Sequence, residues 1–256
     1  NFGSIFVAKI GVILDSKVIP ARFCQPNPSS KSFSSAMKVV CLFSICLLFS
    51  ISTFSQVSKT EVKLLWSDEF EQDGLPNLSK WSLEVGDHGW GNNELQLYTS
   101  GQSKNARVQG GVLVVEAHAD ANQPKGYTSA KLVSKGKGAW QYGYVEVRAK
   151  LPQGRGTWPA IWMLPEVNNF GGWPKSGEID IMEHVGYDPG TVHGTVHTES
   201  FNHLLGTQKG GKLVVPNFAS EFHTYAVDWK KDQMDFYIDG KHYFSFKNTG
   251  NGYQEW

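Results

Sequence analysis

Apolar and polar residues alternate with a period of two along much of the chain after about residue 60, and apolar residues at helical spacing are scarce. The alternation predicts strands over residues 111–119, 142–151, 157–164, 178–183, 191–197 and 222–229. A hairpin is predicted where residues 234–238 and 242–246 flank Asp239-Gly240, a dipeptide suited to a two-residue turn. Short strands separated by Gly, Asn and Pro indicate an all-β fold: an antiparallel β-sandwich or jelly roll, with a barrel as the alternative.

The first 55 residues follow a different pattern. Met37 is the first methionine, and one cation, Lys38, precedes a short apolar run that leads into small polar residues. This is the layout of a secretory signal peptide, and the run is too short to span a bilayer comfortably. The alternative for the run is a buried strand or helix. We therefore expect 37–55 to be a signal peptide, 1–36 to be translated leader outside the domain, and 56–256 to form one domain of a secreted or periplasmic protein.

Composition narrows the class of protein. The chain has 9 Trp, 9 Tyr and 15 Phe, which suits a β-rich fold with a surface for stacking. Lys and Arg number 24 against 24 Asp and Glu, so the basic surface that a nucleic-acid binder needs is missing. Without the first 55 residues the balance becomes 19 against 23, a net charge of −4. Cys24, Cys41 and Cys46 all fall in that first part, so 56–256 can form no disulfide.

The candidate chemistry lies in the segment GEIDIMEHVG, which places three carboxyl groups within six residues. On a regular strand Glu178 and Asp180 share a face, whereas Glu183 falls in phase with the isoleucines. One extra residue, such as a β-bulge at Ile181–Met182, returns Glu183 to the face of the other two. The sequence therefore predicts a row of three carboxyl groups facing solvent.

Three carboxyl groups in a row repel one another, so at least one pKa should rise. Hydrolysis of a glycosidic bond uses such a set, because it needs one carboxylate as nucleophile and one carboxylic acid as proton donor. Two alternatives are an acidic, solvated edge strand and a calcium site, although calcium favours flexible loops over isoleucine-interleaved strands. Trp158 and Trp162 are four residues apart on a predicted strand, with Trp173 further along. Exposed indoles suit the apolar faces of sugar rings.

At this point the sequence resembles glycoside hydrolase family 16. The E-x-D-x-x-E form of the segment is similar to that of laminarinases, agarases and carrageenases, whereas lichenases have a shorter form. Other segments resemble the laminarinase branch: WSDEF, NNELQLYT, YTSAKLVSKGK, GTWPAIWMLP, WPKSGEIDIMEHVG and GTVHTESFNH. The resemblance runs from about residue 64 to residue 256. It implies a concanavalin-like β-jelly-roll sandwich of two antiparallel sheets with a substrate cleft across one of them.

The resemblance also implies roles for individual residues. Glu178 matches the nucleophile, Glu183 the acid/base and Asp180 the assisting carboxylate of retaining hydrolysis. The remaining matches are to substrate-binding positions: Asn93, Arg148, Trp158, Trp162, Trp173 and His197. The implied function is a secreted endo-β-1,3-glucanase that acts on β-glucan as a monomer. The alternatives are a hydrolase or transglycosylase of another polysaccharide (mixed-linkage glucan, agar or carrageenan) and a non-catalytic β-glucan-binding module.

No cofactor or catalytic metal is expected. His193 and His197 are four residues apart, but on a strand they only share a face, and no third zinc ligand is evident. Some family members bind a structural calcium, and Glu69 resembles one of its ligands. The chain ends at Trp256, whereas family members continue for some tens of residues that include strands and a second calcium ligand. We therefore expect a domain truncated at its C-terminus and do not expect the calcium.

Overall fold

A computed structural model describes residues 4–14 and 63–256. The chain divides into two units, one formed by 1–16 with 62–256 and the other by 17–61. The second unit, and with it the predicted signal peptide at 37–55, lies outside the described residues. The described residues of the first unit form strands and turns without a helix, so they contain no helical membrane span.

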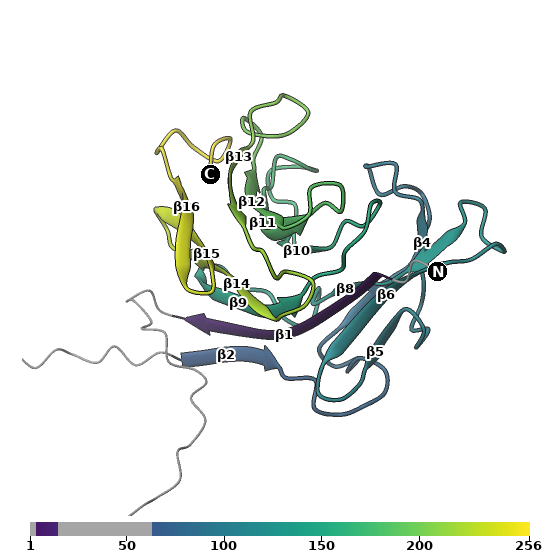
Figure 1. Cartoon of the computed structure of the whole chain (residues 1–256). Helices are drawn as coiled ribbons and strands as arrows, with labels where there is room; N and C mark the ends of the chain where they lie inside the picture. Colours follow the sequence, from purple (N-terminus) through teal and green to yellow (C-terminus); the bar gives the residue numbers. More distant parts are fainter. Residues whose placement is uncertain (1–3, 15–62) are drawn as a thin grey trace, which may run out of the picture. The chain divides into compact units, whose positions relative to one another are not determined.

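One sheet has ten strands, in the order β16-β15-β14-β9-β1-β6-β7-β4, with β2 paired to β1 and β5 paired to β6 (Figure 1). Its strands are β1 Ser4–Leu14, β2 Lys63–Asp68, β4 Gln96–Tyr98, β5 Ala106–Val108, β6 Leu113–Ala119, β7 Tyr127–Ser129, β9 Gly143–Lys150, β14 His223–Trp229, β15 Gln233–Ile238 and β16 Lys241–Lys247. All pairings are antiparallel except β4 with β7.

A second sheet has four strands in the order β10-β11-β12-β13, drawn in green in Figure 1. They are β10 Ala160–Met163, β11 Glu178–His184, β12 Thr191–His197 and β13 Lys209–Val214. The strands β3 Ser82–Glu84 and β8 Lys131–Val133 form a separate pair.

The two larger sheets enclose the main core. On β9 the alternate residues Val145, Val147 and Ala149 are buried, and they join a cluster that includes Ile179 and Met182 of β11. The other buried members come mainly from β12, β14, β15 and β16: Leu151, Ile181, Val192, Val196, Val215, Phe218, Tyr225, Val227, Met234, Phe236, Ile238 and Phe246. Apolar inner faces on two sheets define a sandwich, so the predicted all-β fold is confirmed.

The strand β1 corrects one expectation. It pairs with β9 on one side and with β6 and β2 on the other, inside the ten-stranded sheet. Its sequence, SIFVAKIGVIL, is rich in β-branched residues, which favour strands. The sequence predicts 1–36 outside the domain because these residues precede Met37, the first methionine. The structure includes 4–14 in the fold, and 15–36 lie outside the described residues.

The predicted hairpin at Asp239-Gly240 is confirmed. The two residues join β15 to β16 and have φ values of 51° and 73°. Positive φ at both central positions belongs to the two-residue turn whose twist matches that of the strands.

Candidate active site

The three carboxyl groups of β11 lie on its face away from the core because the strand carries a bulge. Asp180 pairs with Thr195 of β12, and Glu183 pairs with His193. Three steps along β11 therefore match two steps along β12, so β11 has one extra residue. Ile181 and Met182 are both buried in the core, which returns Glu183 to the face of Asp180. The predicted bulge and the shared face of the three carboxyl groups are confirmed, but Asp180 is buried and does not face solvent as predicted.

Each outer carboxyl group of the row accepts one indole N–H. Trp173 Nε1 donates to Glu178 Oε2 over 2.7 Å, and Trp158 Nε1 donates to Glu183 Oε1 over 3.0 Å. Both tryptophans lie in chain segments that flank β11 and its neighbour β10, not on β11 itself. The two hydrogen bonds restrict the rotation of the carboxyl groups without neutralising them.

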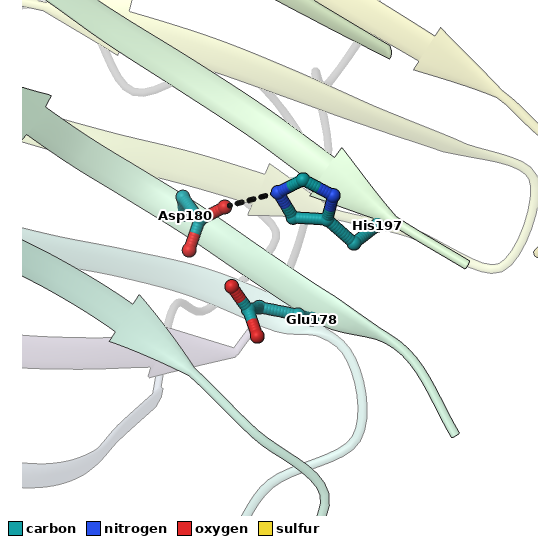
Figure 2. Close-up of side chains that lie close together, drawn as sticks. All are labelled: Glu178, Asp180 and His197. Carbon is teal, nitrogen blue, oxygen red and sulfur yellow. Dashed lines mark ion pairs between the residues drawn. The ribbon is translucent and has the colours of Figure 1, made fainter. Parts of the chain in front are cut away.

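The central carboxyl group pairs with a histidine. His197, at the end of β12, places its Nε2 3.4 Å from Asp180 Oδ2, as Figure 2 shows. Asp180 is 3% exposed and His197 is 6% exposed. Asp180 Oδ2 and His197 Nδ1 have no hydrogen-bond partner among the residues that the structure describes. The buried pair of Asp180 and His197 therefore forms the floor of the row, by which we mean its deepest part. Asp180 Oδ2 and His197 Nδ1 remain free to accept or donate a hydrogen bond there.

Burial dominates the acidity of all three carboxyl groups. It raises the pKa of Glu178 to about 8, and the charge of Asp180 adds to the rise. Burial also raises the pKa of Asp180, helped by Glu183, and the pKa of Glu183. The N–H groups of Trp173 and Trp158 act in the opposite direction on their carboxyl partners. The row thus keeps protons at a pH where ordinary carboxyl groups have lost them.

One group of potential metal ligands occurs in the part of the chain that the structure describes. Glu178, Asp180 and His197 each bring a ligand atom within 4.8 Å of the others. These are the side chains of the carboxyl row and its floor, so they have an assignment that needs no metal. His193 does not belong to this group. Glu69, which resembles a calcium ligand of some family members, is not part of it either, and the expectation that calcium is not bound remains a prediction.

Aromatic side chains line the solvent side of the row. Trp158 is 49% exposed, and Trp162 and Trp173 are each 38% exposed. Trp162 pairs with Asp180 across the β10–β11 ladder. The structure adds two residues that the sequence reasoning missed, because the Lys131 ammonium lies 4.9 Å from the Trp162 ring centre and 4.2 Å from that of Trp90. Lys131 and Trp90 stand more than thirty residues from the row, so no local pattern joins them to it.

Arg148 is a correction. It lies on β9, where the residues on either side of it, Val147 and Ala149, face the core. Its guanidinium therefore projects from the outer face of the ten-stranded sheet, 4.2 Å from the Phe222 ring centre. The carboxyl row lies beyond the core on the other sheet, so we place Arg148 outside the site.

Among the described residues, no hydrogen bond joins Asn93 to the row, and its role in substrate binding remains a prediction. Asn93 is exposed in the loop before β4 and has a φ of 57°. That conformation is one that asparagine adopts more readily than most residues, so the structure gives Asn93 a turn role.

His203 is a further residue that the sequence reasoning passed over. It follows β12, and its ring centre lies 4.8 Å from that of Trp173 and 5.3 Å from that of His197. The segment GTVHTESFNH, which ends at His203, carried part of the family resemblance and was the available signal.

Comparison with known proteins agrees with this geometry. A model of the family described as Glycosyl hydrolases family 16 matches residues 91–255. The chain belongs to this family. A beta-glucanase of Rhodothermus marinus is 54% identical over 188 residues, covering 73% of this chain and 66% of that protein. A glucan endo-1,3-beta-glucosidase of Cryptopygus antarcticus is 40% identical over 184 residues, covering 70% and 67%. This chain thus spans about two thirds of either relative.

The fold of this family 16 member is similar to that of a solved laminarinase structure. The laminarinase of Rhodothermus marinus superposes with a TM-score of 0.74 at 51% sequence identity, covering 76% of this chain and 80% of that one. The fold is the β-jelly roll of the family 16 laminarinases.

Proposed function

We propose that this protein is a secreted, retaining endo-β-1,3-glucanase. The observation that carries the proposal is the bulged strand β11, which presents Glu178 and Glu183 on one face with Asp180 between them. Each outer carboxyl group is held by its own indole N–H. The names of the relatives, a beta-glucanase, an endo-1,3-beta-glucosidase and a laminarinase, support β-1,3-glucan as the substrate.

The reaction proceeds by two displacements. A Glu178 oxygen attacks the anomeric carbon while Glu183 gives its proton to the departing glycosidic oxygen, and the bond between that carbon and oxygen breaks. A glycosyl ester on Glu178 results. Glu183, now ionised, takes a proton from water as the water oxygen attacks the same carbon, and Glu178 leaves. Two inversions restore the original anomeric configuration.

The surroundings of the row act on the ionisation that these roles require. Glu178 must be ionised to attack: burial raises its pKa to about 8, and the Trp173 N–H and His197 oppose that rise by favouring the ionised form. Glu183 must hold a proton, and burial raises its pKa so that it can do so near neutral pH. Asp180, buried between them, opposes the ionisation of Glu178 through its own charge, and Glu183 in turn opposes the ionisation of Asp180.

The exposed indoles suit a neutral sugar chain. Trp158, Trp162 and Trp173 offer flat apolar faces beside the row, and sugar rings present matching faces. The net charge of −4 over residues 56–256 gives no general attraction for a sulfated chain. Export through a signal peptide, action as a monomer and catalysis without a cofactor complete the proposal.

The test is the release of reducing ends from laminarin by the full chain, in EDTA, with mixed-linkage glucan, agarose and carrageenan in parallel. Short oligosaccharides should appear from laminarin and be absent with Glu178→Gln and Glu183→Gln, while both variants keep the circular dichroism spectrum of the wild type. Activity in either variant removes the assignment of that residue. Binding to laminarin without cleavage by the folded wild type favours the non-catalytic module, and cleavage of another polysaccharide alone favours that substrate.

A further inference from the structure

His203 lies beside the row without belonging to it. It is an exposed residue in the connection from β12 to β13, residues 198–208. Its ring is 4.8 Å from the Trp173 ring, centre to centre, with 33° between the planes. An exposed histidine in a loop usually samples several rotamers, so the first question is whether the loop holds His203 in this place.

The residue before it answers that question. Asn202 is 2% exposed, and its amide group donates to the backbone oxygens of Thr198 and Glu199 over 3.2 Å and 3.0 Å. Its side-chain oxygen accepts the Leu205 N–H over 3.2 Å, so the chain before and after His203 is tied to one buried side chain. Two more hydrogen bonds, from the Thr207 N–H to the Asn202 oxygen and from the Thr207 hydroxyl to the Ser200 oxygen, close the loop.

Trp173 needs support from outside its own loop. It lies in the connection from β10 to β11, where Gly171 and Gly177 both have positive φ. The Trp173 side chain is 38% exposed, and its N–H must stay on Glu178 Oε2 for the hydrogen bond to persist. The two loops are also joined by the ion pair of Lys175 with Glu199, 3.3 Å apart. Neighbouring loops thus fix the indole from the side that the sheet does not cover.

Two imidazoles meet the Trp173 ring. His197 comes from β12 with its ring centre 5.8 Å away, and His203 comes from the loop at 4.8 Å. The two histidine rings are nearly perpendicular, with their centres 5.3 Å apart. The His197 Nε2 lies against Asp180, whereas the His203 ring packs on the rings of Trp173 and His197. Aromatic rings in tilted or edge-to-face contact attract one another beyond the area that they bury.

We propose that His203 is a positioning residue of the hydrolytic site: its imidazole packs on Trp173 and holds the Trp173 N–H on the Glu178 carboxyl group. The proposal rests on the proposed function, since Glu178 is the nucleophile there. His203 acts through another residue, and a small displacement of a reacting group is costly because the attacking oxygen must meet the anomeric carbon in line.

The charged groups near His203 give the proposal a second consequence. Burial lowers the pKa of His203 and the charge of His197 of β12 lowers it further, while Glu183 of β11 acts in the opposite direction. The electrostatic interaction with His203 in turn lowers the pKa of Glu183. Removing the imidazole therefore removes one group that lowers the pKa of Glu183, the proton donor. It also removes the ring that packs on Trp173 beside the nucleophile Glu178.

The experiment compares His203→Ala with His203→Phe in steady-state hydrolysis of laminarin. Loss of the ring should lower kcat about tenfold with KM within about twofold, because positioning acts on the transition state more than on binding. His203→Phe keeps a ring against Trp173 and should recover most of kcat. His242→Ala, at an exposed histidine whose ring bonds Ser245 on β16, is the matched control and should behave as the wild type.

A double-variant cycle with Trp173→Phe, which removes the indole N–H, separates positioning from a general structural role. If His203 acts through Trp173, His203→Ala should have less than about a twofold effect in the Trp173→Phe background. Equal effects in both backgrounds overturn the proposal, as does a rise in KM alone, which would mean direct contact with glucan. His203→Phe keeps the test valid if the alanine variant does not fold.

Failure of the proposal and failure of the proposed function look different. A wild type that cleaves no glucan overturns the proposed function and this inference with it. An active wild type with unchanged kcat in His203→Ala overturns this inference alone.

Discussion

At the residue scale, the raised pKa of Glu178 on β11 lowers the stability of the folded protein near neutral pH. Glu178 ionises in the folded protein only at about pH 8, whereas an ordinary glutamate does so near 4.5. Between these two values the folded protein holds a proton that the unfolded chain has released. Folding stability must then fall as pH rises through that window, because the unfolded state binds fewer protons. The catalytic carboxyl group is therefore a destabilising feature near neutral pH.

Replacing that carboxyl group should raise stability. Glu178→Gln removes the cost of ionising a buried acid, so its thermal midpoint should exceed that of the wild type at pH 8 and approach it at pH 4.5. Thermal melts of both proteins across this range measure the difference. A constant difference, or one that shrinks towards alkaline pH, contradicts the raised pKa of Glu178.

Asp180 should control the acid limb of the rate profile. Its charge raises the pKa of Glu178, so Asp180→Asn should lower that pKa and move the acid limb of kcat/KM to lower pH. The variant should also lose more than about tenfold in kcat, since it changes a group between nucleophile and acid. A limb that stays in place or moves to higher pH would mean that Asp180 does not act on Glu178 by charge.

The sequence allowed the row and its bulge to be predicted but not every residue around it. Alternation showed that Glu178, Asp180 and Glu183 could share a face, since Ile179, Ile181 and Met182 had to be buried. For Arg148 alternation gave the correct face of β9, but only the packing of two sheets shows that this face is the outer one. His203 and Lys131 were missed because tertiary contacts alone bring them to the tryptophans.

At the element scale, the extra residue of β11 decides which way Glu183 points. The neighbouring strand β10 shows the same irregularity, with Ile161 opposite Met182 and Trp162 opposite Asp180. In their pairing with β11, the strands β10 and β12 each leave one residue of β11 unpaired. The bulge therefore affects the pairing on both sides of β11.

Deleting Met182 should remove the bulge and keep the carboxyl row. In the shortened strand the glutamate would follow Ile181 directly and, by regular alternation, share the face of Glu178 and Asp180. The loss of the buried Met182 side chain should lower the thermal midpoint, and the shift of the glutamate along the strand towards Asp180 should lower kcat. The conservative Ile181→Val should cost only about 0.5–1.5 kcal/mol and keep the activity. Activity assays and melts of the two variants make the comparison, and a deletion variant with the wild-type kcat would show that the spacing set by the bulge does not matter for hydrolysis.

Several predicted strands are confirmed, with shifted ends. The segment predicted at 191–197 matches β12, whereas that predicted at 157–164 shortens to β10 Ala160–Met163. Pro159 lacks an N–H for the ladder, so Trp158 falls before the strand. Three-residue strands such as β3, β4 and β8 are too short to show alternation, and β13, with the sequence KGGKLV, has too few apolar residues to show it.

At the scale of the whole described unit, close approach of the two sheets depends on glycine. A Cβ atom at Gly211 of β13 would lie 2.6 Å from the Phe244 Cβ of β16. A Cβ atom at Gly194 of β12 would overlap Tyr243, which also lies on β16. Neither glycine has an unusual φ, so the constraint is space and not backbone conformation.

Gly211→Ala should therefore destabilise the sandwich by roughly 1–3 kcal/mol, the usual cost of overpacking. Denaturant unfolding measures the loss. Gly206→Ala is the control for a glycine with open space, although its φ of 67° adds a small backbone strain. Since Gly211 points away from the carboxyl row, the folded variant should keep its kcat, and a large loss of kcat at full stability would show that the packing does not act as described.

The two indole N–H groups on the catalytic carboxyl groups have an optical consequence. Tryptophan emission responds to charge near the ring and to the removal of water, and both Trp158 and Trp173 sit where a proton comes and goes and where sugar would displace solvent. Two of the nine tryptophans of the chain therefore act as built-in reporters. The ionisation of the row and the arrival of a glucan can both be followed by intrinsic fluorescence, without a chromogenic substrate or an attached dye.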